Sequence, residues 1–314
     1  MKPFNRREFF KFCGKLSLAF FGTSTFLPKF AQGFERLAKG EVKVLWLSGQ
    51  GCSGDAMSLV YGDSLPIIHL ITSLIDLRFQ PLLSVAQGEF AIDIFDEISK
   101  KGDFILCFEG AVPAKMPEAC VINGQPVTKW LQKLAKVADV IVACGTCASF
   151  GGIPKASKET GSISVAKYLK SKNIVKPLVR IPGCPMNPTR FIGTIAYFAA
   201  TGKLPPLDKK SRPLMYYRKI IHDNCPRFHY FAEDQYTKKL SEKGLCLFCY
   251  GCRGPITYAD CPLRTWNGEM NWCINANTPC IGCAHPNFPW DPERGIYRDP
   301  STVPLTVEFG REKI

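Results

Sequence analysis

The sequence lacks a hydrophobic run long enough to cross a membrane. The apolar stretch near the N-terminus, residues 16–27, has only twelve residues, whereas a helix needs about 20 to span a bilayer. The tail that follows residue 283 is polar and rich in proline. We therefore expect no transmembrane helix, and any membrane association would come through a partner or a retained signal.

Acidic residues are scarce relative to basic ones. The chain has 27 Asp and Glu against 40 Lys and Arg, a net charge of +13, and residues 1–40 contribute eight basic and two acidic residues, or +6 of that total. The remaining +7 is spread along the chain and is typical of a solvated surface. No basic stripe with interleaved aromatic residues is present, so we expect no nucleic-acid partner.

The segment 222–283 lacks the periodic apolar residues that hold an ordinary domain together. It contains eight of the fifteen cysteines, within the sequences HDNC, CLFCYGC, ADC, NWC and PCIGC, separated by Gly, Pro and Asn. An odd number of cysteines fits poorly with a pure disulfide framework. The pattern, together with His222, one of only four histidines, indicates ligands for more than one metal centre.

The first forty residues resemble an export signal. Arg6 and Arg7 precede aromatic residues and the short apolar stretch, which predicts a secretory signal with the twin-arginine address. An amphipathic N-terminal helix is the alternative, and no small-x-small cleavage site is evident. Because this route carries folded proteins, it suits a chain that acquires its cofactors before export to the periplasm or the outer face of the cytoplasmic membrane.

Residues 41–206 alternate between strand and helix patterns. We expect strands at 42–48, 103–110, 140–144 and 177–183, and helices at 64–79, 126–139, 162–172 and 187–203. This alternation favours a parallel sheet with helices on both faces, and a flavodoxin-like α/β domain is the expected version. An irregular, cysteine-rich iron–sulfur domain would follow at 207–314.

Polar and sulfur side chains follow the predicted strands. The four strand ends lead to Cys52 with Asp55, to Glu109, to Cys147 and to Cys184. Functional crevices of open parallel sheets lie at the carboxyl ends of the strands. The convergence indicates a metal centre at that edge, although each residue taken alone could be a small core or loop residue.

The ligand types limit the choice of metal. Sets of four soft thiolates suit zinc or iron–sulfur clusters. The ligands of residues 41–206 are spread over more than a hundred positions, unlike a compact zinc knuckle. Several sulfur-rich centres, one with a histidine ligand that would raise its potential, favour electron transfer through iron–sulfur clusters.

The chain resembles the small, electron-transferring subunit of nickel–iron hydrogenases over essentially its whole length. The resemblance is carried by WLSGQGCSG, EGAVP, GTCASFGG, PGCPMNP, HDNCPR, GCRGPITYADCP, WNGEMNWC and PCIGC. It implies three iron–sulfur clusters and a large nickel–iron partner subunit, docked over the Cys52 edge, where H2 is split into protons and electrons. The external electron acceptor would be a cytochrome of b or c type or a quinone-linked subunit.

By this resemblance, residues 222–283 hold a distal and a medial cluster. The distal 4Fe–4S cluster would be bound by His222, Cys225, Cys246 and Cys252. The medial cluster would use Cys261, Cys280 and Cys283, a set that holds a 3Fe–4S cluster in many relatives. Those relatives have proline where this chain has Cys273, so a medial 4Fe–4S cluster with Cys273 as fourth ligand is our hypothesis, with 3Fe–4S as the alternative.

The proximal cluster departs from the family pattern. Cys52, Cys147 and Cys184 match three ligands, but Asp55 replaces the second cysteine of the family's C-T-G-C motif. We expect Asp55 to bind iron; Cys144 as a rival ligand and an open or three-iron site stay as alternatives. Relatives with unusual oxygen resistance carry two additional cysteines around this cluster. The matching positions in this chain are Gly54 and Gly152, so we expect that particular protection against oxygen to be absent.

Several other residues and functions stay open. Glu109 is either a structural carboxylate at the sheet edge or part of a proton path, Cys107 is expected in the core, and Cys249 is expected to be a bystander beside the distal cluster. Two rival functions are an electron-transfer subunit of another respiratory complex, such as the quinone-reducing type, and an exported binding protein held together by disulfides or zinc.

Overall fold

The computed structural model describes residues 42–62, 75–240, 244–266 and 270–289. The predicted twin-arginine signal, most of the helix predicted at 64–79 and the tail beyond residue 289 lie outside these ranges. Within the described ranges, no helix is both long and apolar enough to cross a bilayer.

A five-stranded sheet is the centre of the first half of the chain. Its strands are β1 (Lys43–Ser48), β2 (Asp76–Phe79), β3 (Ile105–Glu109), β7 (Val140–Cys144) and β9 (Leu178–Ile181). They lie in the order β2-β1-β3-β7-β9, and every neighbouring pair is parallel. This is the flavodoxin-like order 2-1-3-4-5, so the predicted fold class is confirmed.

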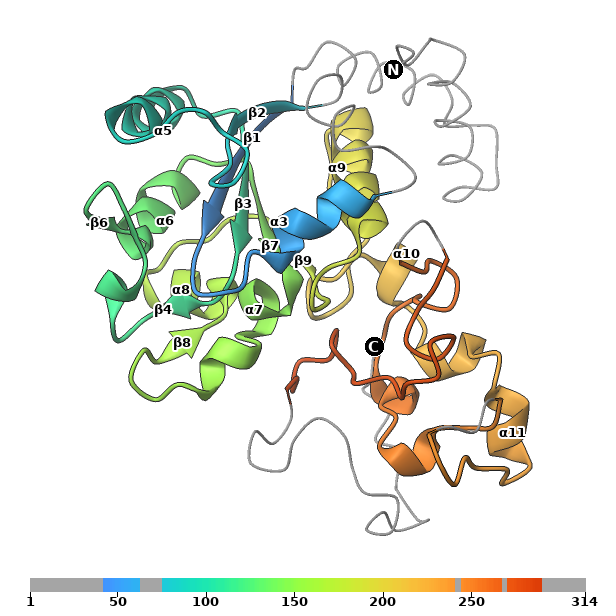
Figure 1. The fold of residues 1–314 in the computed structure, drawn as a ribbon. Coiled ribbons are helices and arrows are strands. Elements are labelled where there is room, and N and C mark those ends of the chain that lie inside the picture. The colour runs from blue at the N-terminus through green and yellow to red at the C-terminus, as the bar shows by residue number, and fades with distance from the viewer. Residues whose placement is uncertain (1–41, 63–74, 241–243, 267–269, 290–314) are drawn as a thin grey trace.

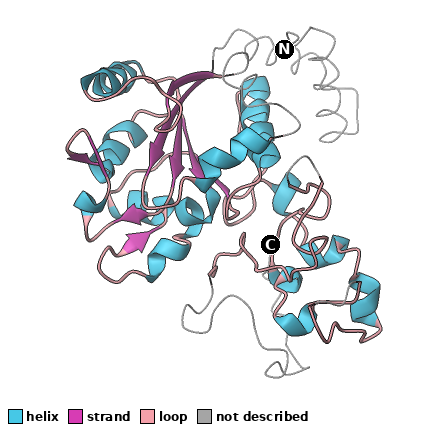
Figure 2. Cartoon of the chain, in the orientation of Figure 1, coloured by secondary structure: helices cyan, strands magenta, loops and turns pink. Residues whose placement is uncertain are grey.

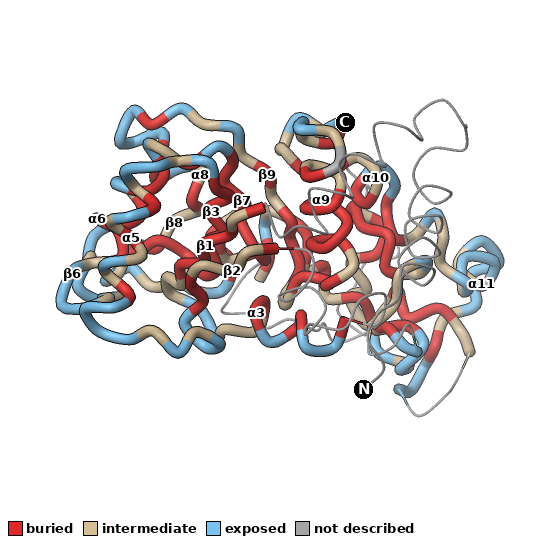
Figure 3. The backbone as a smooth tube through the Cα atoms, turned by 90° about the horizontal axis from the view of Figure 1, so that it is seen from above, coloured by how far each residue is buried: buried red, intermediate tan, exposed pale blue. Residues whose placement is uncertain are grey.

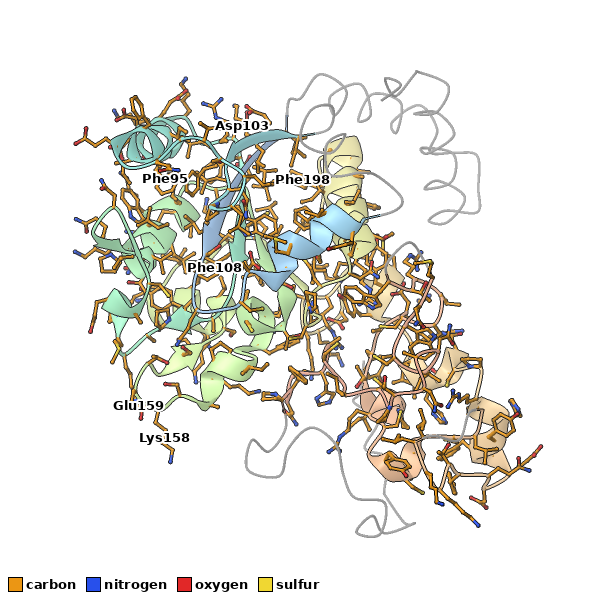
Figure 4. The ribbon with its side chains drawn as sticks, in the orientation of Figure 1. Phe95, Asp103, Phe108, Lys158, Glu159 and Phe198 are labelled. Atoms are coloured by element: carbon orange, nitrogen blue, oxygen red, sulfur yellow. The ribbon has the colours of Figure 1, made fainter. Side chains whose placement is uncertain are left out.

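Helices cover both faces of the sheet, as Figure 1 shows. One face packs on α3 (Gly54–Ser58) and α9 (Pro188–Thr201), and the other on α5 (Glu89–Lys101), α6 (Val127–Ala135) and α8 (Val165–Ser171). Successive residues of a strand point to opposite faces, and Leu106 and Cys107 of β3 accordingly belong to different cores. Figure 4 labels Phe95 and Phe108 in one core and Phe198 beside the other.

Two elements differ from the sequence-based expectation. The end of the predicted helix 64–79 is strand β2, which pairs with β1 through Val44 and Leu77. Local apolar spacing favoured a helix there, but pairing with a buried strand overrides that local preference. Helix α5 was not predicted, although Ala91, Phe95 and Ile98 are buried at helical spacing on it.

The remaining elements of the sheet domain are short. Small antiparallel pairs join β4 (Val112–Pro113) to β8 (Ser162–Ile163) and β5 (Val121–Ile122) to β6 (Gln125–Pro126). Helix α7 (Gly145–Phe150) directly follows β7, and single 3₁₀ turns lie at η2 (Leu59–Tyr61), η4 (Pro117–Ala119) and η5 (Ile153–Ala156).

The cysteine-rich region has a different construction. Its described residues form α10 (Leu214–Tyr217), α11 (Phe228–Ala232) and the 3₁₀ turns η6 (Ile221–Asn224), η7 (Phe248–Tyr250) and η8 (Gly254–Ile256), linked by loops and isolated β-bridges (Figure 2). Buried backbone nevertheless runs through this part as well as through the sheet (Figure 3). The predicted domain boundary between residues 206 and 207 stays a prediction. Ser211, on the far side of that boundary, still accepts a backbone hydrogen bond from Arg180 N of β9 at 2.8 Å.

Candidate metal centres

The carboxyl ends of four strands lie at one level. Ser48 is paired in register with Glu109, Glu109 with Cys144, and Cys144 with Ile181. The loops that follow these strands therefore begin at the same edge of the sheet. These loops carry Cys52 and Asp55 after β1, Cys147 after β7 and Cys184 after β9.

Glu109 fixes the start of α3 at this edge. Its Oε1 accepts hydrogen bonds from the backbone N–H groups of Asp55, at 2.8 Å, and Ala56, at 3.1 Å. Its Oε2 accepts from Trp46 Nε1 at 3.0 Å. These contacts satisfy N–H groups that the first turn of a helix leaves unpaired, which gives Glu109 a structural role. Its part in a proton path stays a prediction.

Asp55 is buried against the backbone of two neighbouring loops. Its Oδ1 accepts a hydrogen bond of 2.6 Å from Met186 N. A Cβ atom at Gly145, where φ is +73°, would lie 2.0 Å from Asp55 Oδ2, so only glycine leaves room for this carboxyl group. Burial, followed by the charge of Glu109, raises the pKa of Asp55 to about 8.

The four residues predicted to bind the proximal cluster interact with one another. Burial raises the pKa of Cys147 to about 12, with further increases from the charges of Cys184, Asp55 and Cys52. Burial likewise raises the pKa of Cys184 to about 11, and Asp55 and Cys52 again contribute. Three thiols and one carboxyl group thus meet at the edge where the strands end.

The rival ligand Cys144 belongs to the hydrocarbon core. Its side chain is fully buried among the residues between the sheet and α9, and its Sγ is 3.7 Å from Val142 O. Burial raises its pKa well above the ordinary value, with contributions from Cys107 and Asp55 rather than from the cysteines at the edge. Cys107 is in the same core, as predicted.

Two glycines lie close to ligand-type sulfurs at this edge. A Cβ atom at Gly152 would be 2.7 Å from Cys147 Sγ, and one at Gly54 would be 3.1 Å from Cys52 Sγ. Side chains at either position would therefore crowd the space around these sulfurs.

The four residues of the predicted medial set also come together. Burial raises the pKa values of Cys280 and Cys283 above the ordinary range, and the charges of Cys261 and Cys273 add to both increases. Cys261 likewise contributes to the raised pKa of Cys273. Cys273 is therefore a neighbour of the other three thiols, as the hypothesis of a fourth medial ligand requires.

The predicted distal residues line one small cavity. Its lining consists of His222, Cys225, Arg227, Cys246, Leu247, Phe248, Cys252, Pro255 and Ile274. Aromatic rings hold the imidazole, because the centroid of the His222 ring lies 5.0 Å from that of Phe228 and 4.6 Å from that of Phe231. Burial raises the pKa of Cys246 to about 11 and that of Cys252 to about 12.

Backbone hydrogen bonds link the proximal set to the medial set and the medial set to the distal set. Cys283 receives a backbone hydrogen bond from Cys184 of the proximal set and is also affected by its charge. Cys252 of the distal set receives a backbone hydrogen bond from Cys280 of the medial set. Thr146 strengthens the first junction, since its hydroxyl donates to Cys283 O while it accepts from Gly183 N at 2.9 Å.

Sequence reasoning missed two arginines beside these groups. Arg227 lines the distal cavity and donates to Leu245 O at 2.9 Å and Ile274 O at 3.0 Å. Arg190 donates to Cys261 Sγ at 3.1 Å. Its position as a single charge within the apolar helix 188–201 was the signal that could have identified it. Cys249 is beside the distal group, where its charge adds to the raised pKa of Cys246.

The three donor sets consist of thiols with one imidazole and one carboxyl group, and soft thiolate ligands in sets of four suit zinc or iron–sulfur clusters. Among the described residues, no group of three or more His, Cys, Asp or Glu side chains has the geometry for one metal ion. All fourteen cysteines that the structure describes are free.

Two family models match the chain in separate places. Residues 217–294 match the C-terminal part of NiFe/NiFeSe hydrogenase small subunits. Residues 52–198 match the 20 kDa subunit of NADH ubiquinone oxidoreductase. The first match covers the medial and distal groups, and the second covers the edge with Cys52, Asp55, Cys147 and Cys184.

Individual proteins match over nearly the full length. The periplasmic [NiFeSe] hydrogenase small subunit of Desulfomicrobium baculatum is 36% identical over 91% of this chain and 96% of its own. The periplasmic [NiFe] hydrogenase small subunit of Solidesulfovibrio fructosivorans is 33% identical over 93% and 92%.

Solved structures agree with these matches. A structure of the Dm. baculatum [NiFeSe]-hydrogenase superposes with a TM-score of 0.75 at 36% identity, covering 80% of this chain and 96% of that one. The actinobacterial-type NiFe-hydrogenase from Ralstonia eutropha H16 superposes with a TM-score of 0.70 at 28% identity, covering 79% and 80%.

Proposed function

This chain belongs to the family of nickel–iron hydrogenase small subunits, and from that premise we propose that it relays electrons through three clusters held by its own side chains. The succession of three four-residue donor sets, joined through Cys184 to Cys283 and through Cys280 to Cys252, is the observation that carries the proposal. Iron–sulfur clusters supply one-electron redox chemistry when bound. The nickel–iron site, where H2 is oxidised to protons and electrons, belongs to a large partner subunit.

The large subunit would dock over the edge that carries Cys52. Cys52 is exposed in this chain, whereas the medial residues Cys261 and Cys280 are buried. An exposed proximal residue is the natural contact with a partner that delivers electrons there. At the other end, electrons would leave near His222 to a cytochrome of b or c type or a quinone-linked subunit.

At the proximal set, we assign Asp55 as the fourth ligand. A buried carboxyl group with a pKa of about 8 would be neutral at pH 7, and a bound cation is what makes its ionised form favourable. Its charge acts on Cys147, Cys184 and Cys144, but the Cys144 side chain is fully buried in the apolar core between the sheet and α9.

Mössbauer spectra of the purified heterodimer test this assignment. Asp55→Ala should change the iron environment of the proximal cluster, and Cys144→Ala should leave it as in the wild type because that thiol fills core space only. The opposite pattern would identify Cys144 as the ligand.

At the medial set, we assign a 4Fe–4S cluster with Cys261, Cys273, Cys280 and Cys283. The fourth thiol, Cys273, is half-buried and its pKa is affected by the charge of Cys261, so it would provide a ligand for a fourth iron. A 3Fe–4S signal from the medial site, seen by EPR of the oxidised wild-type protein, would contradict the assignment.

Export is proposed from residues 1–40. Arg6 and Arg7 provide the twin-arginine address, and relatives from two organisms are named periplasmic. Replacement of both arginines by lysine should leave the protein in the cytoplasm, as measured by fractionation, while its cluster content stays unchanged.

The alternative is an electron-transfer subunit of a complex that does not act on H2. The match of residues 52–198 to a subunit of NADH ubiquinone oxidoreductase favours it. The match of residues 217–294 to hydrogenase small subunits speaks against it, because that segment holds two of the three donor sets. Purification with a nickel-containing large subunit and H2-dependent dye reduction would decide for the hydrogenase, and a complex without nickel would decide against it.

A further inference from the structure

Arg190 is a buried cation that joins α9 to the cysteine-rich region. It comes from α9 of the sheet domain, and its side chain is 1% exposed. Its Nη2 donates to Cys261 Sγ at 3.1 Å, its Nε donates to Asp260 Oδ1 at 2.8 Å, and its guanidinium lies 5.3 Å from the centre of the Tyr217 ring. A guanidinium group stays charged in proteins, so a full positive charge lies against a proposed medial ligand.

The charges around Arg190 are arranged unevenly. Asp260 bridges two cations, because its second oxygen pairs with Arg264. The Arg264 side chain is 22% exposed and, with Asp260, lines an open cavity of about 450 Å³ next to Tyr197 and Tyr216. Arg264 is therefore open to solvent, whereas Arg190 is enclosed and directs one N–H at the sulfur itself.

We propose that Arg190 raises the reduction potential of the medial cluster through its hydrogen bond to Cys261 and its buried positive charge. Reduction adds an electron to the cluster, and a nearby cation stabilises the added negative charge. Hydrogen bonds to cluster sulfurs and net charge are established determinants of cluster potentials. Asp260 holds the guanidinium in place and offsets part of its charge.

This inference rests on the proposed function. It adds that Cys273 and Arg190 have opposite effects on the reduction potential of the medial cluster. Cys273 would add a fourth thiolate and a fourth iron, which lowers the potential relative to a three-iron cluster. Arg190 acts in the opposite direction. The medial cluster thereby stays within range of its proximal and distal neighbours despite the additional thiolate.

The test is a redox titration of the purified heterodimer, followed by the EPR signal of the reduced medial cluster. In Arg190→Gln the cation is lost, so the midpoint should move to lower potential. At the wild-type midpoint the ratio of reduced to oxidised cluster should fall about tenfold, which corresponds to a hydrogen bond to a charged group and to about 59 mV for one electron.

Two further variants separate charge from mere packing. Asp260→Asn keeps the size and an oxygen acceptor but removes the negative charge, so the midpoint should move to higher potential. Arg190→Lys keeps the positive charge, so its midpoint should lie nearer to that of the wild type than the midpoint of Arg190→Gln does. A packing role alone would not produce shifts of opposite sign from adjacent residues.

The outcomes are distinguishable. An unchanged midpoint in Arg190→Gln overturns the inference while the proposed function stands. If that variant does not assemble, an unchanged or lowered midpoint in Asp260→Asn overturns the inference instead. If the wild-type heterodimer shows no medial cluster at all, the proposed function fails and the inference fails with it.

Discussion

The sheet domain and the cysteine-rich region reach a buried interior by different means. The sheet domain encloses two apolar cores, built from alternate residues of the same strands and from helices on each face. The core of the cysteine-rich region combines aromatic residues such as Tyr216 and Tyr217 with the thiols of Cys261 and Cys280. Proposed metal ligands are thus part of the second interior but lie at the edge of the first.

This difference concerns what each part needs in order to fold. Burial of apolar surface is the main favourable contribution to folding, and the strands provide it in β1, β3 and β7. In the cysteine-rich region, short turns and isolated bridges leave much of the order to the clusters, because metal binding to sites of this kind contributes folding free energy directly.

Removal of iron should have the largest effect and should separate the two regions. In protein prepared without clusters, amide hydrogen exchange should become fast throughout residues 214–284, while the amides of β3 and β7 stay protected. Mass-spectrometric exchange of cluster-free and cluster-bound protein measures this. Equal protection in both regions would contradict the claim that the cysteine-rich region depends on the clusters for its order more than the sheet domain does.

Gly145→Ala should be the most damaging single change at the edge of the sheet. The new Cβ would lie 2.0 Å from Asp55 Oδ2, so the carboxyl group must leave its place. We expect loss of the proximal cluster, about one third of the bound iron if three clusters are present.

Gly202→Ala is the matched control for this change. Gly202 also has a positive φ, +65°, but a Cβ there meets nothing within 4 Å. It should cost only backbone strain, about 1–2 kcal/mol of the free energy of unfolding, with unchanged iron content. Equal iron loss in both variants would mean that backbone strain rather than the Asp55 contact is responsible.

Cys273→Ala should have a smaller effect, confined to the medial site. Three thiols that affect one another's pKa would remain there, so the cluster should lose one iron and the oxidised protein should gain a 3Fe–4S EPR signal. Cys249→Ala is the control, since that thiol is a neighbour of the distal set without an assigned ligand role. Wild-type spectra from Cys273→Ala would show that Cys273 does not bind iron.

A pH dependence that depends on Asp55 is expected only in the cluster-free protein. Its pKa of about 8 in the cluster-free fold exceeds the value of about 3.9 in an unfolded chain. Between these values the folded state binds a proton that the unfolded state lacks, so stability falls as pH rises from about 4 to 8 and is level above that. Urea unfolding of cluster-free protein should show this decline, and Asp55→Asn should flatten it; identical curves would contradict the burial of an ionisable carboxyl.

Local pattern predicted most of the sheet domain correctly because strand and helix signals there agree with the tertiary fold. The expected strands at 42–48, 103–110 and 140–144 correspond closely to β1, β3 and β7. The segment 76–79 was predicted wrongly, because its place as a strand depends on pairing with β1, which no local spacing encodes; α5 was missed although its buried residues have helical spacing.

Donor chemistry could be predicted from the sequence alone: twelve residues with suitable donor atoms, in an order that resembles one family, with Asp55 where that resemblance leads us to expect cysteine. The resemblance also predicted the three sets, but the surroundings of each set come from the tertiary fold. It enclosed Cys144 in hydrocarbon, placed Cys273 beside Cys261, and brought Arg190 from α9 to a sulfur 71 positions away. The physical reason is that donor type is a property of each residue, whereas the charges and neighbours that set a cluster's potential come from segments distant in sequence.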